Sequence, residues 1–382
     1  MADHAPTDQR APDAPETDDL NANAQEEMPR AVFTRRRLLV SVLFVVSTVA
    51  FLYFVLPKLL GLKDTWNRIE HGNGWWLGFA AVLEVISFAG YVALFRAVFV
   101  RGKSRIGWRE SYEITMSGLA ATRLFASAGA GGIALTAWAL RRSGMAPRIV
   151  ACRMVAFLAL LYGVYMASLV IVGLGLYTGV IPGGGSFALT VVPAIFGASA
   201  IAVFLAVSML PGDFDRLVKR WTSGKKIGRV MARLATAPAA AATGVRTAID
   251  LVRSRDPYLL GAPVWWGFDI AVLWACFHAF GASPPKGVII MSYFLGMLGN
   301  TLPLPGGIGG VDGGMIGAFS AFGVNVEVAV VAVLSYRALA FWLPTLPGAI
   351  AYLQLRRTVQ RWQQEPAPTQ SGVLSRASGQ AS

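Results

Sequence analysis

Long apolar stretches separated by short polar segments run through the chain from residue 38 onward. The first, Leu38–Leu60, has 23 residues, which as an α-helix would extend about 34 Å, enough to cross the roughly 30 Å hydrocarbon core of a bilayer. The pattern predicts six membrane-spanning helices, over Leu38–Leu60, Trp75–Val100, Val150–Tyr177, Phe187–Leu210, Tyr258–Phe280 and Glu327–Leu355. The expected fold class is therefore an all-α integral-membrane bundle.

Two further segments, 111–140 and 287–324, are too rich in glycine and too interrupted to be simple spans. Each lies between segments expected on the same side of the membrane, so each is predicted to enter and leave from that side as a re-entrant hairpin. With the hairpins included, we expect about eight helices. Because each hairpin contains a glycine run and precedes a span with one arginine, the two halves predict an inverted repeat. The alternative is that glycine packing motifs simply recur in membrane helices.

The distribution of Lys and Arg orients these helices. The net charge is +13, a balance that in a soluble protein would suggest nucleic-acid binding. Here 24 basic residues lie in the segments expected inside and 4 in those expected outside. This asymmetry follows the positive-inside rule, so no nucleic-acid partner is expected. It predicts a multi-pass protein of the cell inner membrane with both termini in the cytoplasm.

The ends and one loop have a different composition. Residues 1–34 contain eight acids and no apolar face, which predicts a disordered cytoplasmic tail. The membrane domain is expected over 35–357, followed by a second disordered tail over 358–382. Within the domain, the cytoplasmic loop 211–256 is basic. Its apolar spacing fits an amphipathic helix on an anionic leaflet, and equally fits plain positive-inside charge.

The densest motif is Pro303-Leu-Pro305-Gly306-Gly307-Ile-Gly309-Gly310-Val-Asp312-Gly313-Gly314. Prolines interrupt helical hydrogen bonding, and glycines allow irregular backbone. Such backbone is tolerated at membrane depth only when it is buried in protein or lines a wet cavity. We expect its free N–H groups, before a helix starting near Met315, to bind an anion such as phosphate. The alternative is a purely structural break. The candidate binding residues here are Gly306, Gly307, Gly309, Gly310 and Asp312.

Five ionisable residues lie within or at the edge of apolar stretches: Glu84, Arg123, Arg153, Asp269 and Arg337. Charges at this depth are costly and usually pair or line a pathway. Three arginines without an intramembrane lysine suit bidentate phosphate recognition, so Arg123, Arg153 and Arg337 are candidate substrate ligands. The alternative is that Asp269 or Glu84 pairs with an arginine and only holds helices together.

Signals for other chemistry are weak. Hydrophobic residues make up 55% and charged residues 14% of the chain, which argues against a soluble enzyme. Cys152 and Cys276 both lie in apolar stretches and form no metal or disulfide motif. The chain contains no nucleotide-binding P-loop and no GxSxG or HExxH motif. We therefore predict no catalytic residue, no metal and no cofactor.

The run Pro303–Gly310, followed by Gly323, Arg337, Pro344 and Gly348, resembles the lysylphosphatidylglycerol synthase transmembrane region. The resemblance covers about residues 35–357. It implies a stand-alone flippase-like protein that moves an anionic or aminoacylated phospholipid, or another polar lipid, across the membrane. In those synthases a soluble aminoacyltransferase domain follows the membrane part, and such a domain is not expected here.

Together with the residue pattern above, this leads us to expect roles for individual residues. The arginines would contact a lipid phosphate, and Asp312 would meet a cationic group or neutralise an arginine. Two other functions stay open at this point: a non-transporting partner of a separate lipid-modifying enzyme, and an integral-membrane lipid-linked transferase. A membrane phospholipid is the expected ligand, and the sequence does not decide between a monomer and a homo-oligomer.

Overall fold

The computed structural model describes residues 72–100, 104–124, 130–209, 241–301, 307 and 309–364. Within these ranges every regular element is a helix, which confirms the all-α fold class. The main helices are α5 (Gly74–Phe99), α6 (Trp108–Leu124), α7 (Ala130–Arg142), α8 (Pro147–Tyr177), α9 (Phe187–Ser208), α12 (Gly261–Ala279), α13 (Lys286–Met297), α14 (Gly310–Ala321), α15 (Val326–Arg337) and α16 (Thr345–Gln364). A further helix covers residues 241–253.

Five segments in the described ranges are long and apolar enough to cross a membrane. They are Gly74–Phe99, Pro147–Tyr177, Phe187–Ser208, Pro257–Ala279 and Val326–Gln364. Each corresponds to one of the predicted spans, and most ends agree within three residues because hydropathy sets the length of such a helix. The first predicted span, Leu38–Leu60, lies outside the described residues, as do the tail over 1–34 and most of the loop 211–256.

Local capping explains where several of these helices begin. The Asn73 side chain accepts a hydrogen bond from the Trp75 amide at 3.0 Å at the start of α5. Asn325 does the same for Glu327 at 2.9 Å at the start of α15. Pro147 occupies the first turn of α8, where its missing N–H has no helical partner to lose. At each of these helix starts at least one first-turn amide is thus satisfied or absent.

Two pairs of short helices form the predicted hairpins. Helices α6 and α7 have 17 and 13 residues, and α13 and α14 have 12 residues each. At 1.5 Å per residue these helices extend about 18 to 26 Å, less than the hydrocarbon core. Glycines sit where the arms cross: a Cβ on Gly132 would lie 2.4 Å from the Gly118 oxygen, and one on Gly299 would lie 2.3 Å from the Gly310 carbonyl carbon.

The last span is not one regular helix. Helix α15 passes into a π-helical turn over Ala338–Trp342, and α16 begins only at Thr345. Pro344 has no N–H to donate to the Ala340 carbonyl four residues earlier, which explains the break. Helix α16 then continues to Gln364, with Val359 and Trp362 buried. The expectation of a disordered tail from residue 358 is therefore wrong for residues 358–364.

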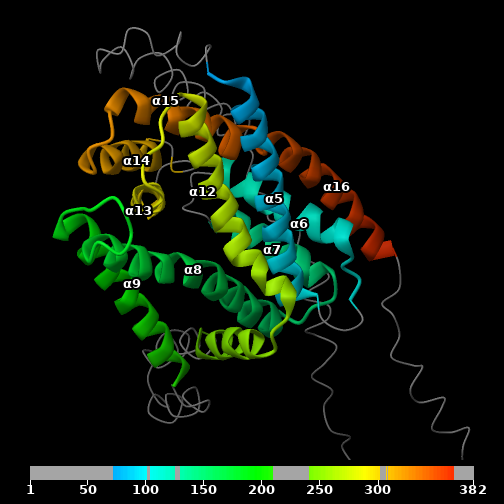
Figure 1. Cartoon of the computed structure of the whole chain (residues 1–382). Helices are drawn as coiled ribbons and strands as arrows, with labels where there is room; N and C mark the ends of the chain where they lie inside the picture. The colour runs from blue at the N-terminus through cyan, green and yellow to red at the C-terminus, as the bar shows by residue number, and fades with distance from the viewer. Residues whose placement is uncertain are drawn as a thin grey trace, which may run out of the picture.

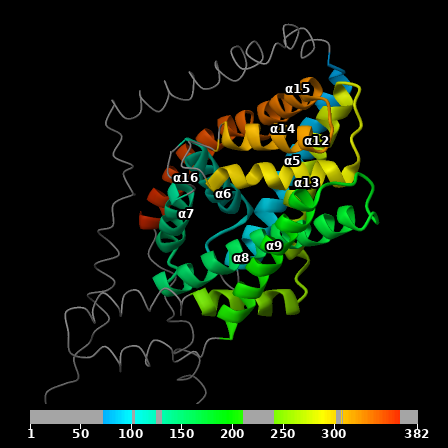
Figure 2. The same cartoon turned by 90° about the vertical axis from the view of Figure 1, so that its left-hand side faces the viewer.

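The order of elements repeats along the chain. A long helix, a two-helix hairpin and another long helix occur as α5, α6–α7 and α8, and again as α12, α13–α14 and α15–α16. The leading helices of the two halves, α5 and α12, run antiparallel and pack side by side (Figures 1 and 2). This order is what an inverted repeat requires, and the membrane side of each hairpin stays a prediction.

Close packing holds α5 and α12 together. A Cβ on Gly261 would lie 2.2 Å from the Gly90 oxygen, so the two backbones touch where the helices cross. Near the same crossing, the Ser87 hydroxyl donates to the Trp265 carbonyl at 2.9 Å. At the other end the Asn73 amide donates to the Ala279 carbonyl at 2.9 Å. The two halves of the protein are thus joined along most of the length of these helices.

The remaining contacts place each hairpin against the closing helix of the other half. Helix α16 packs along α6, where a Cβ on Gly348 would lie 2.9 Å from the Met116 oxygen. Helix α13 packs against α8, and the Tyr165 hydroxyl donates to the Phe294 carbonyl at 2.6 Å. Helix α9 packs on α8 at the edge of the molecule (Figure 1). This exchange brings polar residues from both halves to the centre.

Candidate functional site

Five ionisable side chains from five helices meet in the interior of the bundle. Glu84 comes from α5, Arg123 from α6, Asp269 from α12, Asp312 from α14 and Arg337 from α15. Except for Arg123, which is half-buried, all of them are buried. We call this set the central cluster. Buried charges at such density mark a functional site by default in a membrane protein.

Arg337 and Asp312 form a buried ion pair. The Arg337 Nε atom lies 2.7 Å from Asp312 Oδ1, and the two side chains are 9% and 1% exposed. The other carboxylate oxygen of Asp312 accepts a hydrogen bond from the Gly309 amide at 2.8 Å. Asp312 was expected either to meet a cationic group of the ligand or to neutralise an arginine. In the structure it forms an ion pair with Arg337, which is the second of these roles.

The same hydrogen bond changes the expectation for the start of this helix. Helix α14 begins at Gly310, so the prediction of a helix starting near Met315 is wrong by five residues. Asp312 occupies the N-terminus of α14 as its anion, because a carboxylate in the first turn satisfies free amides and opposes the positive end of the helix dipole. An incoming phosphate would have to compete with this carboxylate.

The glycines of the motif have specific backbone roles. Gly307 and Gly309 have φ values of +66° and +84°, which side-chain-bearing residues rarely adopt. At Gly307 a Cβ would also lie 2.2 Å from the Asn300 side-chain oxygen. Gly310 faces Gly299 across the hairpin, and Gly306 lies outside the described residues. The motif thus positions the Asp312 carboxylate, and its direct contact with a ligand stays a prediction.

Arg123 is held by backbone from the broken last span. Its Nη1 and Nη2 atoms donate to the carbonyls of Phe341 at 3.0 Å and Ala340 at 2.9 Å. The Ala340 carbonyl is the one that Pro344 leaves without its helical donor. A proline in the last span therefore creates an acceptor for an arginine in the first hairpin.

One aromatic ring connects the two arginines of the central cluster. The guanidinium carbons of Arg123 and Arg337 lie 5.1 Å and 4.4 Å from the centre of the Phe341 ring. Arg123 also lies 5.7 Å from the ring of Phe88. Contact with an aromatic face stabilises a guanidinium without neutralising it. Two positive charges are thus kept within one small region.

The carboxyl groups of Glu84 and Asp269 lie within hydrogen-bonding reach of each other. Asp269 Oδ2 accepts hydrogen bonds from the hydroxyl groups of Tyr293 and Tyr336, the second at 3.0 Å. The expected alternative was that one of these acids pairs with an arginine only to hold helices together. Asp269 is also held by two tyrosines, which sequence reasoning missed, and the purely structural alternative stays a prediction. A phenol within an otherwise apolar stretch was the available signal.

Arg153 is placed elsewhere. Its Nη1 atom donates to the Phe99 carbonyl at 2.9 Å. Phe99 is the last residue of α5, where carbonyls lack helical partners and a cation is favourable. The structure therefore brings Arg123, Arg337 and Asp312 together but sets Arg153 at a helix end. Its role in binding substrate stays a prediction.

A fourth buried acid, Glu113, was not identified from the sequence. Glu113 on α6 is fully buried, pairs with Arg109 at 2.9 Å and accepts a hydrogen bond from Thr358 at 2.7 Å. Because Thr358 lies on α16, this network ties the closing helix to the first hairpin. The i,i+4 spacing of Arg109 and Glu113 was the signal.

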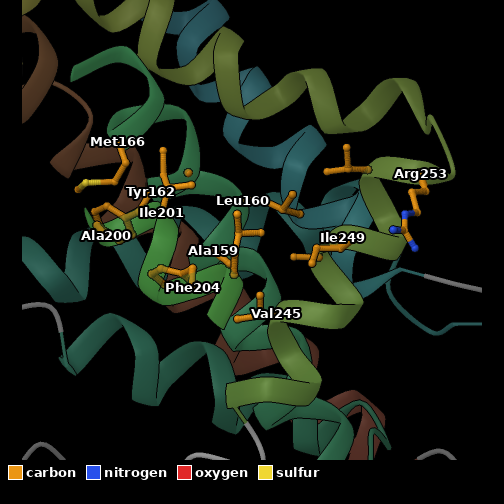
Figure 3. A pocket seen from close by; sticks show the side chains of 14 residues that line it. Ala159, Leu160, Tyr162, Met166, Ala200, Ile201, Phe204, Val245, Ile249 and Arg253 are labelled. Carbon is orange, nitrogen blue, oxygen red and sulfur yellow. The ribbon is translucent and has the colours of Figure 1, made fainter. Parts of the chain in front are cut away.

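An apolar cavity of about 570 Å³ lies between α8, α9 and the helix over 241–253. Figure 3 shows the side chains that line it, with Leu160, Phe204 and Ile249 near its middle and Arg253 at one end. Its volume is in the range of cavities that hold small organic ligands. The cavity is separate from the central cluster and shares no lining residue with it.

Comparison with known proteins identifies the family. The family model of the lysylphosphatidylglycerol synthase TM region matches residues 38–348, which is most of the chain. The chain belongs to this family. The expected resemblance is thereby confirmed, and the central cluster lies wholly within the part that matches the lysylphosphatidylglycerol synthase TM region.

Two UPF0104 membrane proteins of Methanothermobacter thermautotrophicus match the chain, which agrees with this family. One is 24% identical over 326 residues, covering 81% of this chain and 94% of the relative. The other is 37% identical over 87 residues, covering 22% of this chain and 25% of the relative. No solved structure shows significant similarity. These relatives support a multi-pass membrane protein of the lysylphosphatidylglycerol synthase TM region family.

Proposed function

We propose that this protein translocates a polar lipid across the cell inner membrane, with an anionic or aminoacylated phospholipid as the substrate class. The observation that carries the proposal is the pair of guanidinium groups, Arg123 and Arg337, which lie 5.1 Å and 4.4 Å from the centre of the Phe341 ring inside a membrane-spanning bundle. Guanidinium groups bind phosphate oxygens in bidentate fashion. Both termini are placed in the cytoplasm in this proposal.

Arg123 is the better first contact for a lipid phosphate. It is half-buried, whereas Arg337 is buried and already paired with Asp312. Among the described residues, the hydrogen bonds of Arg123 go to two neutral carbonyls and no carboxylate forms a direct ion pair with it. A phosphate arriving at Arg123 would be close enough to Arg337 to draw it away from Asp312. Substrate binding would then loosen the contact between α14 and α15.

The broken elements around the cluster also support movement. Irregular backbone at membrane depth is usual where transporters bind their substrates. Here the glycine-rich start of α14 contains Asp312, and the π-helical turn at Ala338–Trp342 directly follows its partner Arg337. The apolar cavity beside α8 has a suitable volume for part of a lipid acyl chain.

The test is lipid movement in proteoliposomes. Head-group-labelled phosphatidylglycerol and its lysyl derivative are placed in one leaflet, and their appearance in the other is followed. We expect movement with the wild type, loss of movement with Arg123→Gln, and wild-type movement with Arg148→Gln. Arg148 is the matched control because it is an exposed arginine on α8, outside the cluster.

Two results would contradict the proposal. If the folded wild type moves neither lipid, translocation of these two substrates is ruled out. Copurification with a soluble enzyme would then favour the function of a non-transporting partner. If a folded Arg123→Gln protein moves lipid at the wild-type rate, Arg123 is not required for translocation. Size-exclusion chromatography in detergent establishes that each variant is folded.

A further inference from the structure

The contact between Glu84 and Asp269 has no use in binding a lipid phosphate. The two acids face each other across the interface of α5 and α12 and are 3% and 5% exposed. Two ionised carboxylates in contact away from water repel strongly, so a pair of this kind normally holds a proton. The surroundings of each acid indicate which of the two carries that proton.

Asp269 is well supported as an anion. The hydroxyl groups of Tyr293 and Tyr336 both donate to its Oδ2 atom, the second at 3.0 Å. Glu84 lacks such support, because its Oε2 atom is buried and no group on the described part of the chain donates to it. Leaving a buried anionic oxygen without a donor is expensive. A protonated Glu84 that donates to Asp269 removes both the repulsion and the missing hydrogen bond.

The charges of the central cluster lead to the same result. It contains three acids, Glu84, Asp269 and Asp312, and two arginines, Arg123 and Arg337. Arg337 is 2.7 Å from Asp312, which leaves Arg123 alone to balance both Glu84 and Asp269. With all groups ionised the cluster carries a net charge of −1, and one bound proton makes it neutral.

Other titratable groups near the pair do not change this count. Tyr91 and Cys276 lie on α5 and α12 themselves, Tyr162 and Tyr165 face them from α8, and Tyr293 and Tyr336 come from α13 and α15. Phenol and thiol groups buried in this way are neutral. The charge of the site is therefore set by the two acids and Arg123.

We infer that Glu84 and Asp269 form a proton-binding site in which Glu84 carries one proton and shares it with the Asp269 carboxylate. Losing the proton would place a second negative charge beside Arg123 and strengthen the hold of the cluster on its guanidinium. A bound proton would leave Arg123 with more positive charge to offer. Proton binding and the binding of an anion at Arg123 should therefore favour each other, and by linkage each raises the affinity for the other.

This coupling step rests on the proposed function, but the proton site itself does not. If lipid translocation is correct, a proton moving down its gradient would load the site together with the lipid. The gradient would then supply energy for directional movement. If translocation is wrong, the shared proton is still present in the folded protein and can be measured without any substrate.

The direct test is infrared spectroscopy of the purified protein at neutral pH. We expect a carbonyl stretching band of a protonated carboxyl group that shifts in D₂O and disappears in Glu84→Gln. Glu113→Gln is the matched control, because Glu113 is equally buried but pairs with Arg109 and accepts from Thr358. The band should remain in that variant. A wild type without the band, or a band that survives Glu84→Gln, would overturn the proton site.

Thermal stability gives a second measurement that does not depend on spectroscopy. Glutamine has the shape and neutrality of a protonated glutamate, so Glu84→Gln should keep the melting temperature of the wild type. Glu113→Gln should lower it, because it removes the charge opposite Arg109. A large loss of stability in Glu84→Gln would show that Glu84 is ionised and would contradict the inference.

A transport arm separates the two proposals. In proteoliposomes with an imposed pH gradient, wild-type lipid movement should respond to the gradient, and movement by Glu84→Gln should not. Lipid movement that does not respond to the pH gradient would support translocation and rule out its coupling to protons. If the folded wild type moves no lipid, the proposed translocation is ruled out. The infrared band would still show whether Glu84 carries a proton.

Discussion

Arg337 Nε lies 2.7 Å from Asp312 Oδ1, and the second carboxylate oxygen of Asp312 accepts from the Gly309 amide at 2.8 Å. One buried carboxylate thus joins the end of α15 to the start of α14. The pair fixes the register of these two helices as well as the charge of the site. Its removal should therefore affect folding before it affects any ligand.

Replacing either member of this pair should destabilise the protein. Arg337→Ala or Asp312→Ala leaves an uncompensated buried charge, which typically costs about 3–5 kcal/mol. The double variant Asp312→Ala/Arg337→Ala should lose much less than the sum of the two single losses. Thermal unfolding in detergent, followed by size-exclusion chromatography, measures all three. Additive losses would show that the two side chains act independently.

Restoring a donor at Pro344 should weaken the hold on Arg123. In Pro344→Ala the new amide can bond the Ala340 carbonyl within the helix and compete with Arg123 Nη2. We expect slower lipid movement and slower backbone hydrogen exchange at residues 344–346. Pro347→Ala is the control, because its amide would face Leu343, which does not bind Arg123. Equal effects of both substitutions would rule out this mechanism.

The close backbone crossings at Gly299, in the second hairpin, and at Gly261, between α5 and α12, should tolerate no added methyl group. At Gly299 and Gly261 a Cβ would lie within 2.3 Å and 2.2 Å of backbone atoms, so alanine there must push two helices apart. At Gly313 and Gly317 no atom of the described residues would lie within 4 Å of an added Cβ. Alanine at these positions should be neutral or stabilise by roughly 0.5–1 kcal/mol. Melting temperatures of the four single variants test this contrast, and similar values for all four would contradict the packing.

Cysteine labelling tests the predicted sides of the hairpins. Ala146 lies between α7 and α8, and Ser283 lies between α12 and α13; both are exposed. With Cys152 and Cys276 replaced by alanine, Ala146→Cys should react with an impermeant maleimide only from the cytoplasm. Ser283→Cys should react only from the outside. If both cysteines are labelled from the same side, the two hairpins do not enter from opposite sides of the membrane, and the inverted topology is wrong.

The long helices could be predicted because their lengths follow from hydropathy alone. Phe187–Leu210 was predicted and Phe187–Ser208 is observed, since lipid-facing helices must be apolar over a bilayer thickness. The start of α14 was harder to predict, because a glycine-rich stretch has little intrinsic helix preference. The Asp312 side chain stabilises the start of α14 by accepting a hydrogen bond from the Gly309 amide. This capping hydrogen bond forms only in the folded structure.

The members of the site were easier to predict than their partners. Arg123, Arg337, Glu84 and Asp269 stand out as charges in apolar sequence. Which of them meet depends on how two halves of the chain pack, and spacing along the sequence holds no information on that. Arg153 has the same sequence signature as Arg123, yet it ends at the Phe99 carbonyl because α8 places it near the end of α5.

The hydrogen bonds of Arg123 to the last span also bear on how the protein is made. Its acceptors, the carbonyls of Ala340 and Phe341, come 217 and 218 residues later in the chain. At about 5–20 residues per second, a ribosome needs roughly 10 to 40 s to reach them. During that time the first hairpin carries an arginine without its final partners in or near the bilayer. Until the last helix arrives, the nascent chain must therefore keep this hairpin at the membrane surface or in contact with the insertion machinery.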